Sequence, residues 1–353
     1  MTISSLSRAV AAEFAPQTIY LNTSTCGLLP RRAVDAVKTL VDENASGLRD
    51  GSGDFGAVNR AREGFARLAG VGAGRVAVGG SVAAHVGLIA SSLPPGAEVL
   101  SPEGEFSSVV SPFAVRGDLK MRYVPLEELA DAVRLGTALV AFSSVQSADG
   151  RRADLDAVRA AAADNGARTL LDATQSAGWL PLDAGAYDYT VTGGFKYLLC
   201  PRGTSFLTVT EEAQEGLVPV YAGMAAAEDR WNSTYGPVTE LASDARRYDE
   251  PPAFLAYHGA EHSLALIHEI GIDTLHAHAT GLADRFRSGL AALGHTAVPA
   301  DTAVVAVPGL GDRAPELQRA GVLVAGRAGN LRASFHLYNT EADVDRALDV
   351  LAG

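Results

Sequence analysis

The sequence predicts an α/β fold, in which a large domain with a mostly parallel sheet is joined to a smaller α+β domain at the C-terminus. Strand-like and helix-like segments alternate through the first two-thirds of the chain, which is typical of a parallel sheet covered by helices on both faces. This pattern changes after Glu211. The chain has 353 residues, 47% of them hydrophobic, so it can bury one large core and a smaller companion.

Seven short apolar runs are expected to form the strands of the large domain. Between them, residues 81–93 and 154–165 carry Ala, Val and Leu at the spacing of helices that lie on a sheet. We assign residues 15–250 to this domain. The strand candidates are residues 75–79, 97–101, 121–125, 138–145, 169–174, 190–193 and 205–209.

Residues 251–353 are assigned to the small domain, and residues 1–14 are a candidate addition to it. A long helical pattern covers residues 253–293, and strand-like runs follow at 303–307 and 331–335. The last helix is expected to begin after Thr340. A threonine followed three residues later by an acid, here Asp343, can satisfy free backbone amides at a helix start.

Composition excludes several classes of protein. The chain has 29 basic and 41 acidic side chains and a net charge of −12, whereas a general binder of nucleic-acid backbones needs positive charge. Two cysteines, Cys26 and Cys200, provide neither a disulfide framework nor a metal-binding cluster, which points to a reducing cytoplasm. The chain shows no leader pattern and no apolar run near the ~20 residues of a membrane helix. We expect a soluble cytoplasmic protein without nucleic-acid or membrane partners.

Asp172 and Lys196 form the most informative pair in the sequence. Asp172 ends an apolar run, and Lys196 follows a second run in the setting Gly-Gly-Phe-Lys-Tyr. Ligands of α/β proteins collect at the carboxyl ends of parallel strands, where both residues are expected. A pyridoxal phosphate (PLP) enzyme needs a lysine that holds the aldehyde and an acid that keeps the ring nitrogen protonated. Local context alone leaves a surface lysine and a turn acid as alternatives.

Several separated segments resemble the class V aminotransferase family, from Tyr20-Leu-Asn-Thr-Ser-Thr-Cys-Gly to Leu331-Arg-Ala-Ser-Phe-His. This family includes cysteine desulfurases, kynureninases, isopenicillin N epimerase-like proteins and ergothioneine-type carbon–sulfur lyases. The resemblance implies the PLP-dependent transferase fold type I, PLP as cofactor, an amino acid as substrate and a homodimer. It also implies that Lys196 is the catalytic lysine and forms a Schiff base with the cofactor.

The resemblance assigns further contacts to the cofactor ring. Asp172 is expected at the ring nitrogen and Gln175 at the ring oxygen, with Gln146 facing the same oxygen or the substrate. Phe106 occupies the position from which the family stacks an aromatic ring on the cofactor. Cysteine desulfurases have histidine there, and a phenyl ring can stack but cannot carry a proton. A core phenylalanine is the alternative.

The phosphate is expected at Gly80, Ser81 and Val82, because a glycine-rich strand-to-helix turn exposes backbone amides at the positive end of a helix. A plain tight turn is the alternative. The family often has a Gly-Thr pair that reaches the phosphate of the neighbouring subunit. Here the corresponding region is Arg246-Arg-Tyr-Asp-Glu-Pro-Pro, so Arg246 or Arg247 is a candidate replacement.

Arg332 is the expected partner of the substrate's α-carboxylate, because a guanidinium forms two parallel charged hydrogen bonds. Asn22 and Thr23 are expected to line the same pocket. No cysteine follows Cys200, so persulfide chemistry would require Cys26 to take over that role. We therefore expect β-elimination, including carbon–sulfur cleavage, through an external aldimine. Transamination, epimerisation and a catalytically inactive regulator are the alternatives.

Overall fold

The computed structural model describes residues 10–353 and confirms the predicted α/β fold. Its main sheet has seven strands in the order β2-β8-β7-β6-β5-β3-β4. The strands from β7 to β4 are parallel, and β8 runs antiparallel to β2 and β7. Each predicted run overlaps one strand: β2 (Val76–Gly79), β3 (Glu98–Pro102), β4 (Lys120–Val124), β5 (Thr137–Ser143), β6 (Arg168–Asp172), β7 (Tyr189–Gly193) and β8 (Ser205–Val209).

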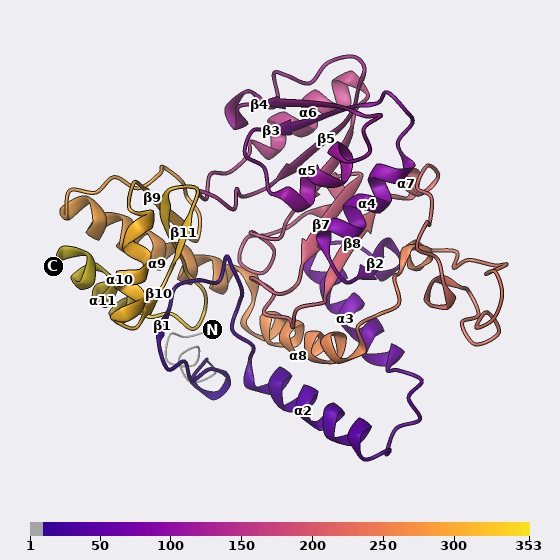
Figure 1. Ribbon diagram of the computed structural model, residues 1–353, viewed down its shortest axis with the longest axis horizontal. Coiled ribbons are helices and arrows are strands. Elements are labelled where there is room, and N and C mark those ends of the chain that lie inside the picture. The colour runs from indigo at the N-terminus through magenta and orange to yellow at the C-terminus, as the bar shows by residue number, and fades with distance from the viewer. Residues whose placement is uncertain (1–9) are drawn as a thin grey trace.

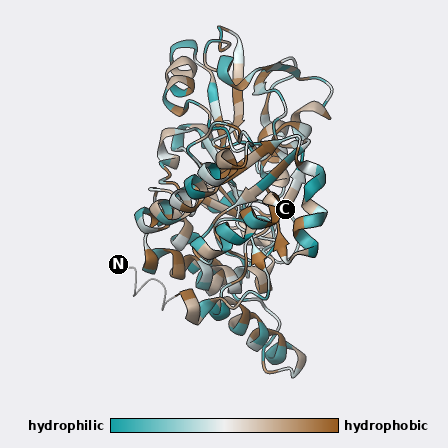
Figure 2. Cartoon of the chain, turned by 90° about the vertical axis from the view of Figure 1, so that its left-hand side faces the viewer, coloured by the Kyte–Doolittle hydropathy of each residue, from teal (hydrophilic) through white to brown (hydrophobic). Residues whose placement is uncertain are grey.

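Helices cover both faces of this sheet. Side chains alternate along β5, so that Leu139 and Ala141 join one buried cluster while Val140 and Phe142 join another. Because both faces are buried, the strands are nearly continuous in apolar residues, whereas the outer helices carry the hydrophilic residues (Figure 2). One face packs against α4 (Val82–Ser92) and α5 (Ser107–Ala114), and the other against α3 (Phe55–Leu68), α6 (Leu155–Asn165) and α8 (Phe254–Ile270).

The C-terminal elements form a second layered unit beside the main sheet (Figure 1). Its three-stranded antiparallel sheet has the order β11-β12-β9. The early strand β1 (Ile19–Tyr20) pairs in parallel with β10 (Val322–Leu323), so the first described segment joins this unit. The other elements are β9 (Val304–Pro308), β11 (Ala325–Arg327), β12 (Asn330–Ser334), α9 (Ile272–Ala292), α10 (Ala314–Arg319) and α11 (Glu341–Ala352).

The capping prediction for the last helix is confirmed. Thr340 Oγ1 accepts a hydrogen bond from the Asp343 N–H at 3.2 Å, and the Asp343 carboxylate accepts one from the Thr340 N–H at 2.8 Å. The helical pattern expected over residues 253–293 is confirmed, and it is divided into two helices, α8 and α9. Gly271 lies between them with a φ of 87°, a conformation that glycine adopts without steric cost.

The proposed domain boundaries remain a prediction. Of the candidate addition 1–14, residues 1–9 lie outside the described residues. Phe14 is buried in the cluster that contains Tyr338, near the end of the chain. The remaining helices near the main sheet are α2 (Arg31–Ala45), which packs against α8, and α7 (Glu211–Gln214).

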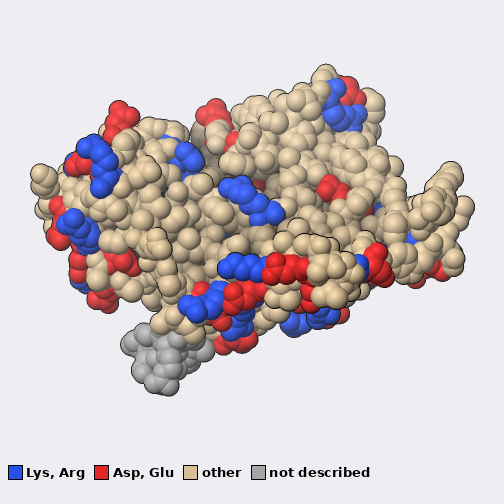
Figure 3. All heavy atoms as spheres, turned by 60° about the horizontal axis from the view of Figure 1, so that its bottom comes forward, with Lys and Arg blue, Asp and Glu red and all other residues tan. Residues whose placement is uncertain are grey.

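Charges of both signs alternate on the face that carries α2 (Figure 3). Arg32 donates to Glu13 at 2.8 Å and to Glu269 at 2.6 Å, and Arg60 donates to Glu261 at 2.5 Å. This face therefore presents no field of a single sign. Within residues 10–353, no helix combines the length and the apolar character needed to cross a membrane.

Candidate active site

The predicted site residues lie just beyond the carboxyl ends of the strands, at one edge of the main sheet. This edge is where α/β folds bind their ligands, because the strands there end in loops that can carry polar side chains. The assignments are Gly80, Ser81 and Val82 after β2, Phe106 after β3, Gln146 after β5, Asp172 and Gln175 at the end of β6, and Lys196 after β7.

Lys196 lies in a loop that is closed by backbone hydrogen bonds. The Gly194 N–H donates to Thr204 O at 2.9 Å, and the Cys200 N–H donates to Gly194 O at 3.0 Å. The N-terminal segment packs directly on this loop at Gly27, where an added Cβ would lie only 2.2 Å from Lys196 O. Only a glycine fits there, so the N-terminal segment around Gly27 holds the loop that carries Lys196.

The side chain of Lys196 is buried among aromatic rings. It is 5% exposed, and its Nζ lies 4.9 Å from the Phe106 ring centroid and 5.9 Å from that of Phe195. Burial lowers the pKa of Lys196 to about 8, against an opposing effect of the Asp172 carboxylate. Near neutral pH the amine is therefore neutral far more often than that of an ordinary lysine, which suits a nucleophile and base.

Asp172 is 4% exposed. Burial raises its pKa to about 6, although the Thr174 N–H donates to its Oδ1 at 2.7 Å and Lys196 favours the charged form. A buried carboxylate with so few hydrogen-bond donors is suited to a cationic ligand. The protonated ring nitrogen of PLP fits this requirement.

A second buried acid, Glu105, lies beside the site and was missed by sequence reasoning. Its carboxylate accepts hydrogen bonds from Ser143 N–H at 2.8 Å, from Ser143 Oγ at 2.6 Å and from Gln146 Nε2 at 2.9 Å. The amide of Gln146 is therefore held by Glu105. A lone acid before Phe106 gives no periodic signal, so only the fold reveals these contacts.

Arg332 on β12 provides a buried cation at the same site. It is 2% exposed, and burial lowers its pKa to about 10. It donates to Ser147 O and, at 2.8 Å, to Thr25 Oγ1, while its Nε is buried without a partner. Gln175 donates from Nε2 to Ser147 Oγ at 3.0 Å, and its Oε1 is also buried without a partner. Buried polar groups without partners indicate where a ligand belongs.

The N-terminal residues divide between the site and the core. Thr25, which was not predicted, contacts Arg332, whereas Thr23 Oγ1 is hydrogen-bonded to Tyr338 OH at 2.5 Å. Asn22 forms a backbone bridge to Ser334, and its Oδ1 is buried without a partner. The side-chain oxygen of Asn22 can therefore accept a hydrogen bond from a ligand, whereas the Thr23 hydroxyl is already hydrogen-bonded within the core.

The turn into α4, predicted to bind the phosphate, has its groups partly engaged within the protein. Ser81 caps the helix, with its Oγ accepting from the Ala84 N–H at 3.2 Å. The Gly80 N–H is held by Glu250 Oε2 at 2.8 Å. Arg246 and Arg247, in the same segment as Glu250, donate instead to carbonyls of residues 227, 242 and 244.

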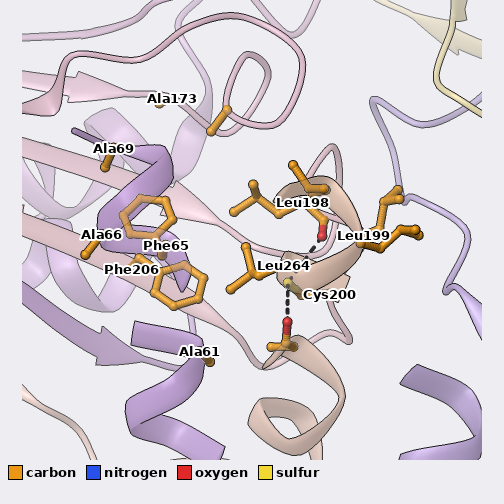
Figure 4. Close-up of a cluster of buried hydrophobic side chains, with 14 of the residues drawn as sticks. Ala61, Phe65, Ala66, Ala69, Ala173, Leu198, Leu199, Cys200, Phe206 and Leu264 are labelled. Atoms are coloured by element: carbon orange, nitrogen blue, oxygen red, sulfur yellow. Dashed lines mark hydrogen bonds between the residues drawn. The ribbon is translucent and has the colours of Figure 1, made fainter. Parts of the chain in front are cut away.

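The two cysteines differ in their surroundings. Cys200 is buried among Phe65, Phe206 and Leu264, with weak hydrogen bonds to two carbonyls (Figure 4). Burial strongly raises the pKa of the Cys200 thiol, which makes it a poor nucleophile. Cys26 is half-buried in the N-terminal segment that packs on the lysine loop.

The chain matches known proteins along most of its length. The family profile of class-V aminotransferases matches residues 19–310. Isopenicillin N epimerase from Streptomyces clavuligerus is 30% identical, with 96% of each chain covered. The uncharacterized aminotransferase YcbU from Bacillus subtilis is 27% identical, with 83% of this chain and 82% of YcbU covered.

Solved structures share the fold. Cysteine desulfurase from Thermococcus onnurineus NA1 superposes with a TM-score of 0.82 at 22% identity, covering 95% of this chain and 94% of its own. The cystine C–S lyase C-DES, in complex with its product cysteine persulfide, gives 0.85 at 21% identity, covering 95% and 97%. Another C-DES structure contains glycine linked to PLP. The chain belongs to the aminotransferase class-V family of PLP-dependent enzymes.

Proposed function

We propose that the protein is a β-eliminating lyase for an α-amino acid with an activated side chain, including carbon–sulfur bonds. The observation that carries this proposal is the placement of one buried amine, Lys196, against two aromatic rings with no second acid–base group at Phe106. The buried Cys200 is unfit to capture sulfur, so the leaving group would depart free. The likeness to a cystine C–S lyase supports the same chemistry.

In this proposal PLP is held by residues of the sheet edge. Asp172 would hold the ring nitrogen, Phe106 would contact the ring, Gln175 would bind the ring oxygen, and the turn that contains Ser81 and Val82 would bind the phosphate. PLP, when bound, supplies an aldehyde and an electron-accepting ring.

The protein's own side chains then orient the substrate and move its proton. The Nε of Arg332, buried and unpartnered, binds the α-carboxylate and so fixes which Cα bond can break. Lys196 Nζ takes the α-proton, the Cβ–X bond breaks, and the electron pair leaves on X. Water then converts the remaining three-carbon unit to pyruvate and ammonia when X is attached to alanine's β-carbon.

A second candidate is epimerisation, which the 30% identity to isopenicillin N epimerase over 96% of both chains favours. Transamination is a third, through the likeness to YcbU. All three begin with removal of the α-proton by Lys196. They differ in the next step: the β-substituent leaves in elimination, Cα regains a proton in epimerisation, and the amino group is passed to a 2-oxo acid in transamination.

The test is incubation of the PLP-loaded protein with cysteine, cystine and S-alkyl cysteines. We expect pyruvate and ammonia in amounts equal to the released sulfur compound, which is hydrogen sulfide from cysteine, cysteine persulfide from cystine and a thiol from an S-alkyl cysteine. Exchange of the α-hydrogen with inversion at Cα and no pyruvate would instead establish epimerisation. Transfer of the amino group to an added 2-oxo acid would establish transamination.

A further inference from the structure

Two arginines beside Lys196 have no role in the chemistry above. Burial is the main cause that lowers the pKa of Lys196. Among the nearby charges, the Asp172 carboxylate raises this pKa, whereas Arg332, Arg202 and Arg327 lower it. Asp172 and Arg332 are assigned to the cofactor ring and the α-carboxylate. Arg202 and Arg327 are exposed, and neither forms an ion pair with any residue in the range 10–353.

Arg202 belongs to the same closed loop as Lys196. Its guanidinium lies 4.3 Å from the ring centroid of Phe195, and the same ring is 5.9 Å from Lys196 Nζ. Stacking on an aromatic ring orients a guanidinium while leaving its N–H groups free for an anion. The described hydrogen bonds include none from the Arg202 side chain, so these donors are available.

Arg327 belongs to the hairpin that carries Arg332. In this hairpin Ala325 is opposite Arg332, and Arg327 is opposite Asn330. Residues directly opposite each other in an antiparallel pair point to the same face, so Arg327 shares a face with Arg332. Arg327 donates one side-chain hydrogen bond, from Nη1 to the adjacent Gly326 O at 3.0 Å, within the part of the chain that the structure describes. Most of its N–H groups are therefore free for a ligand.

We propose that Arg202 and Arg327 bind an anionic group on the substrate's side chain. The preferred substrate is then an α-amino acid that carries a carboxylate or another oxyanion beyond Cβ. This inference rests on the proposed function, since it needs Arg332 to hold the α-carboxylate. An acidic group at the far end of the substrate's side chain would pair with the positive charges of Arg202 and Arg327.

The cofactor phosphate is the competing ligand for these arginines. Its expected site, the turn after β2, is separated from β7 by strand β8. Arg202 lies in the loop between β7 and β8, and its guanidinium contacts Phe195, the ring that also lies near Lys196 Nζ. Arg327 is on the β11–β12 hairpin with Arg332, away from the turn after β2. Because Arg202 precedes Ser205, which pairs with Gly79 beside that turn, the experiment must separate the phosphate from the substrate as its ligand.

A matched pair of ligands tests the proposal. S-carboxymethyl-L-cysteine carries a side-chain carboxylate, and S-carbamoylmethyl-L-cysteine is its neutral amide. Elimination of the acid would consume one water and give pyruvate, ammonia and thioglycolate. Initial binding of each ligand is measured by rapid mixing, from the change in the visible absorption of the PLP-loaded protein, and pyruvate is assayed separately.

We expect the acid to bind about tenfold more tightly than the amide at low salt, with the preference shrinking at high salt. Arg202→Gln and Arg327→Gln should each reduce this ratio about threefold, as for partly exposed charge pairs. The control Arg346→Gln, at an exposed position on α11, should leave the ratio unchanged.

Equal affinity for the two ligands would overturn the inference, as would a preference that survives in the Arg202→Gln/Arg327→Gln double variant. If the variants lose PLP on dialysis while the ratio of acid to amide affinity is unchanged, the arginines bind the cofactor phosphate. That result would also overturn the inference. Absence of pyruvate from both ligands would count against the proposed lyase function alone, because the binding ratio is measured independently.

Discussion

At the scale of single residues, the burial of Asp172 lowers the stability of the cofactor-free protein at neutral pH. Its pKa rises from 3.8 in the unfolded chain to about 6 when buried. The folded state therefore binds more protons between these values, and stability is lost as pH rises from about 4 through 6. At neutral pH the buried carboxylate is charged, and the nearby Lys196 only partly offsets the cost of its burial.

Asp172→Asn should therefore stabilise the cofactor-free protein at pH 7 by roughly 1–3 kcal/mol, because a shift of one pKa unit corresponds to about 1.4 kcal/mol. The gain should vanish below pH 4. The same substitution should weaken PLP binding and abolish turnover. Denaturant unfolding at the two pH values measures the first effect, and a lower stability of the variant at pH 7 would contradict the account.

Lys196 gives a pH dependence of the opposite sign. Its pKa falls from 10.5 to about 8 on burial, so the unfolded chain binds more protons between these values and stability increases with pH across that window. Capture of PLP by the cofactor-free protein requires the neutral amine. Its rate should increase tenfold per pH unit up to about pH 8 and then level off, as measured by stopped-flow absorption. A rate that still climbs towards pH 10 would show an unperturbed lysine.

Single residues also show what the sequence could not reveal. Asp172 and Lys196 end apolar runs, which marks them as groups delivered to a sheet edge. Glu105 and Thr25 carry no such signal, because their partners, Gln146 and Arg332, are brought to them only by the tertiary fold. Their contribution depends on contacts between distant segments.

At the scale of elements, the N-terminal segment and the lysine loop fit each other at Gly27. A Cβ there would lie 2.2 Å from Lys196 O and 2.7 Å from the Leu199 side chain. Gly27→Ala should therefore displace the loop, lowering both thermal stability and PLP content. The control is Gly281→Ala on α9, where nothing lies within 4 Å of the added methyl group.

Gly281→Ala should stabilise the protein by about 0.5–1 kcal/mol, because alanine favours a helix interior. Thermal unfolding and the ratio of bound PLP to protein measure both variants. Equal PLP content in the Gly27→Ala variant and wild type would show that the segment does not position the loop.

Elements differed in how well their sequence predicted them. The inner strands of the main sheet were predicted well because burial on both faces makes them short, mostly apolar runs, whereas the edge strand β4 is partly exposed. The helical pattern of α8 and α9 was predicted without the break between them, because apolar residues continue at helical spacing on both sides of Gly271. The break depends on the local backbone conformation of that glycine, which periodicity does not show.

At the scale of the whole molecule, the segment from Val218 to Tyr235 exposes an unusual number of large apolar side chains. Trp231 is 60% exposed and Tyr235 is 92% exposed. This segment projects from the side of the main sheet that is remote from the C-terminal unit (Figure 1). Exposed apolar clusters mark interaction surfaces, and we expect it to join two copies of the chain in the proposed homodimer.

Trp231→Ser with Tyr235→Ser should shift the protein towards the monomer in light scattering coupled to size exclusion. Leu135→Ser is the matched control, since Leu135 is 88% exposed outside this segment. A monomeric wild type, or a double variant as dimeric as wild type, would exclude this surface as the interface.

The site as a whole draws on both parts of the chain. Lys196 and Asp172 come from the main sheet, Arg332 comes from the small one, and Thr25 comes from the N-terminal segment. The sequence predicted the contributing motifs. It could not predict how the segments meet, because pairings such as that of β1 with β10 join residues from opposite ends of the chain.

The most direct test of the account is reduction of the PLP-loaded protein with borohydride, followed by peptide mapping. We expect a single pyridoxyl adduct on the peptide that contains Lys196, and no adduct in a Lys196→Ala variant that is equally well folded. An adduct on another lysine, or none on the wild-type protein, would contradict the assignment of this amine as the group that holds the cofactor.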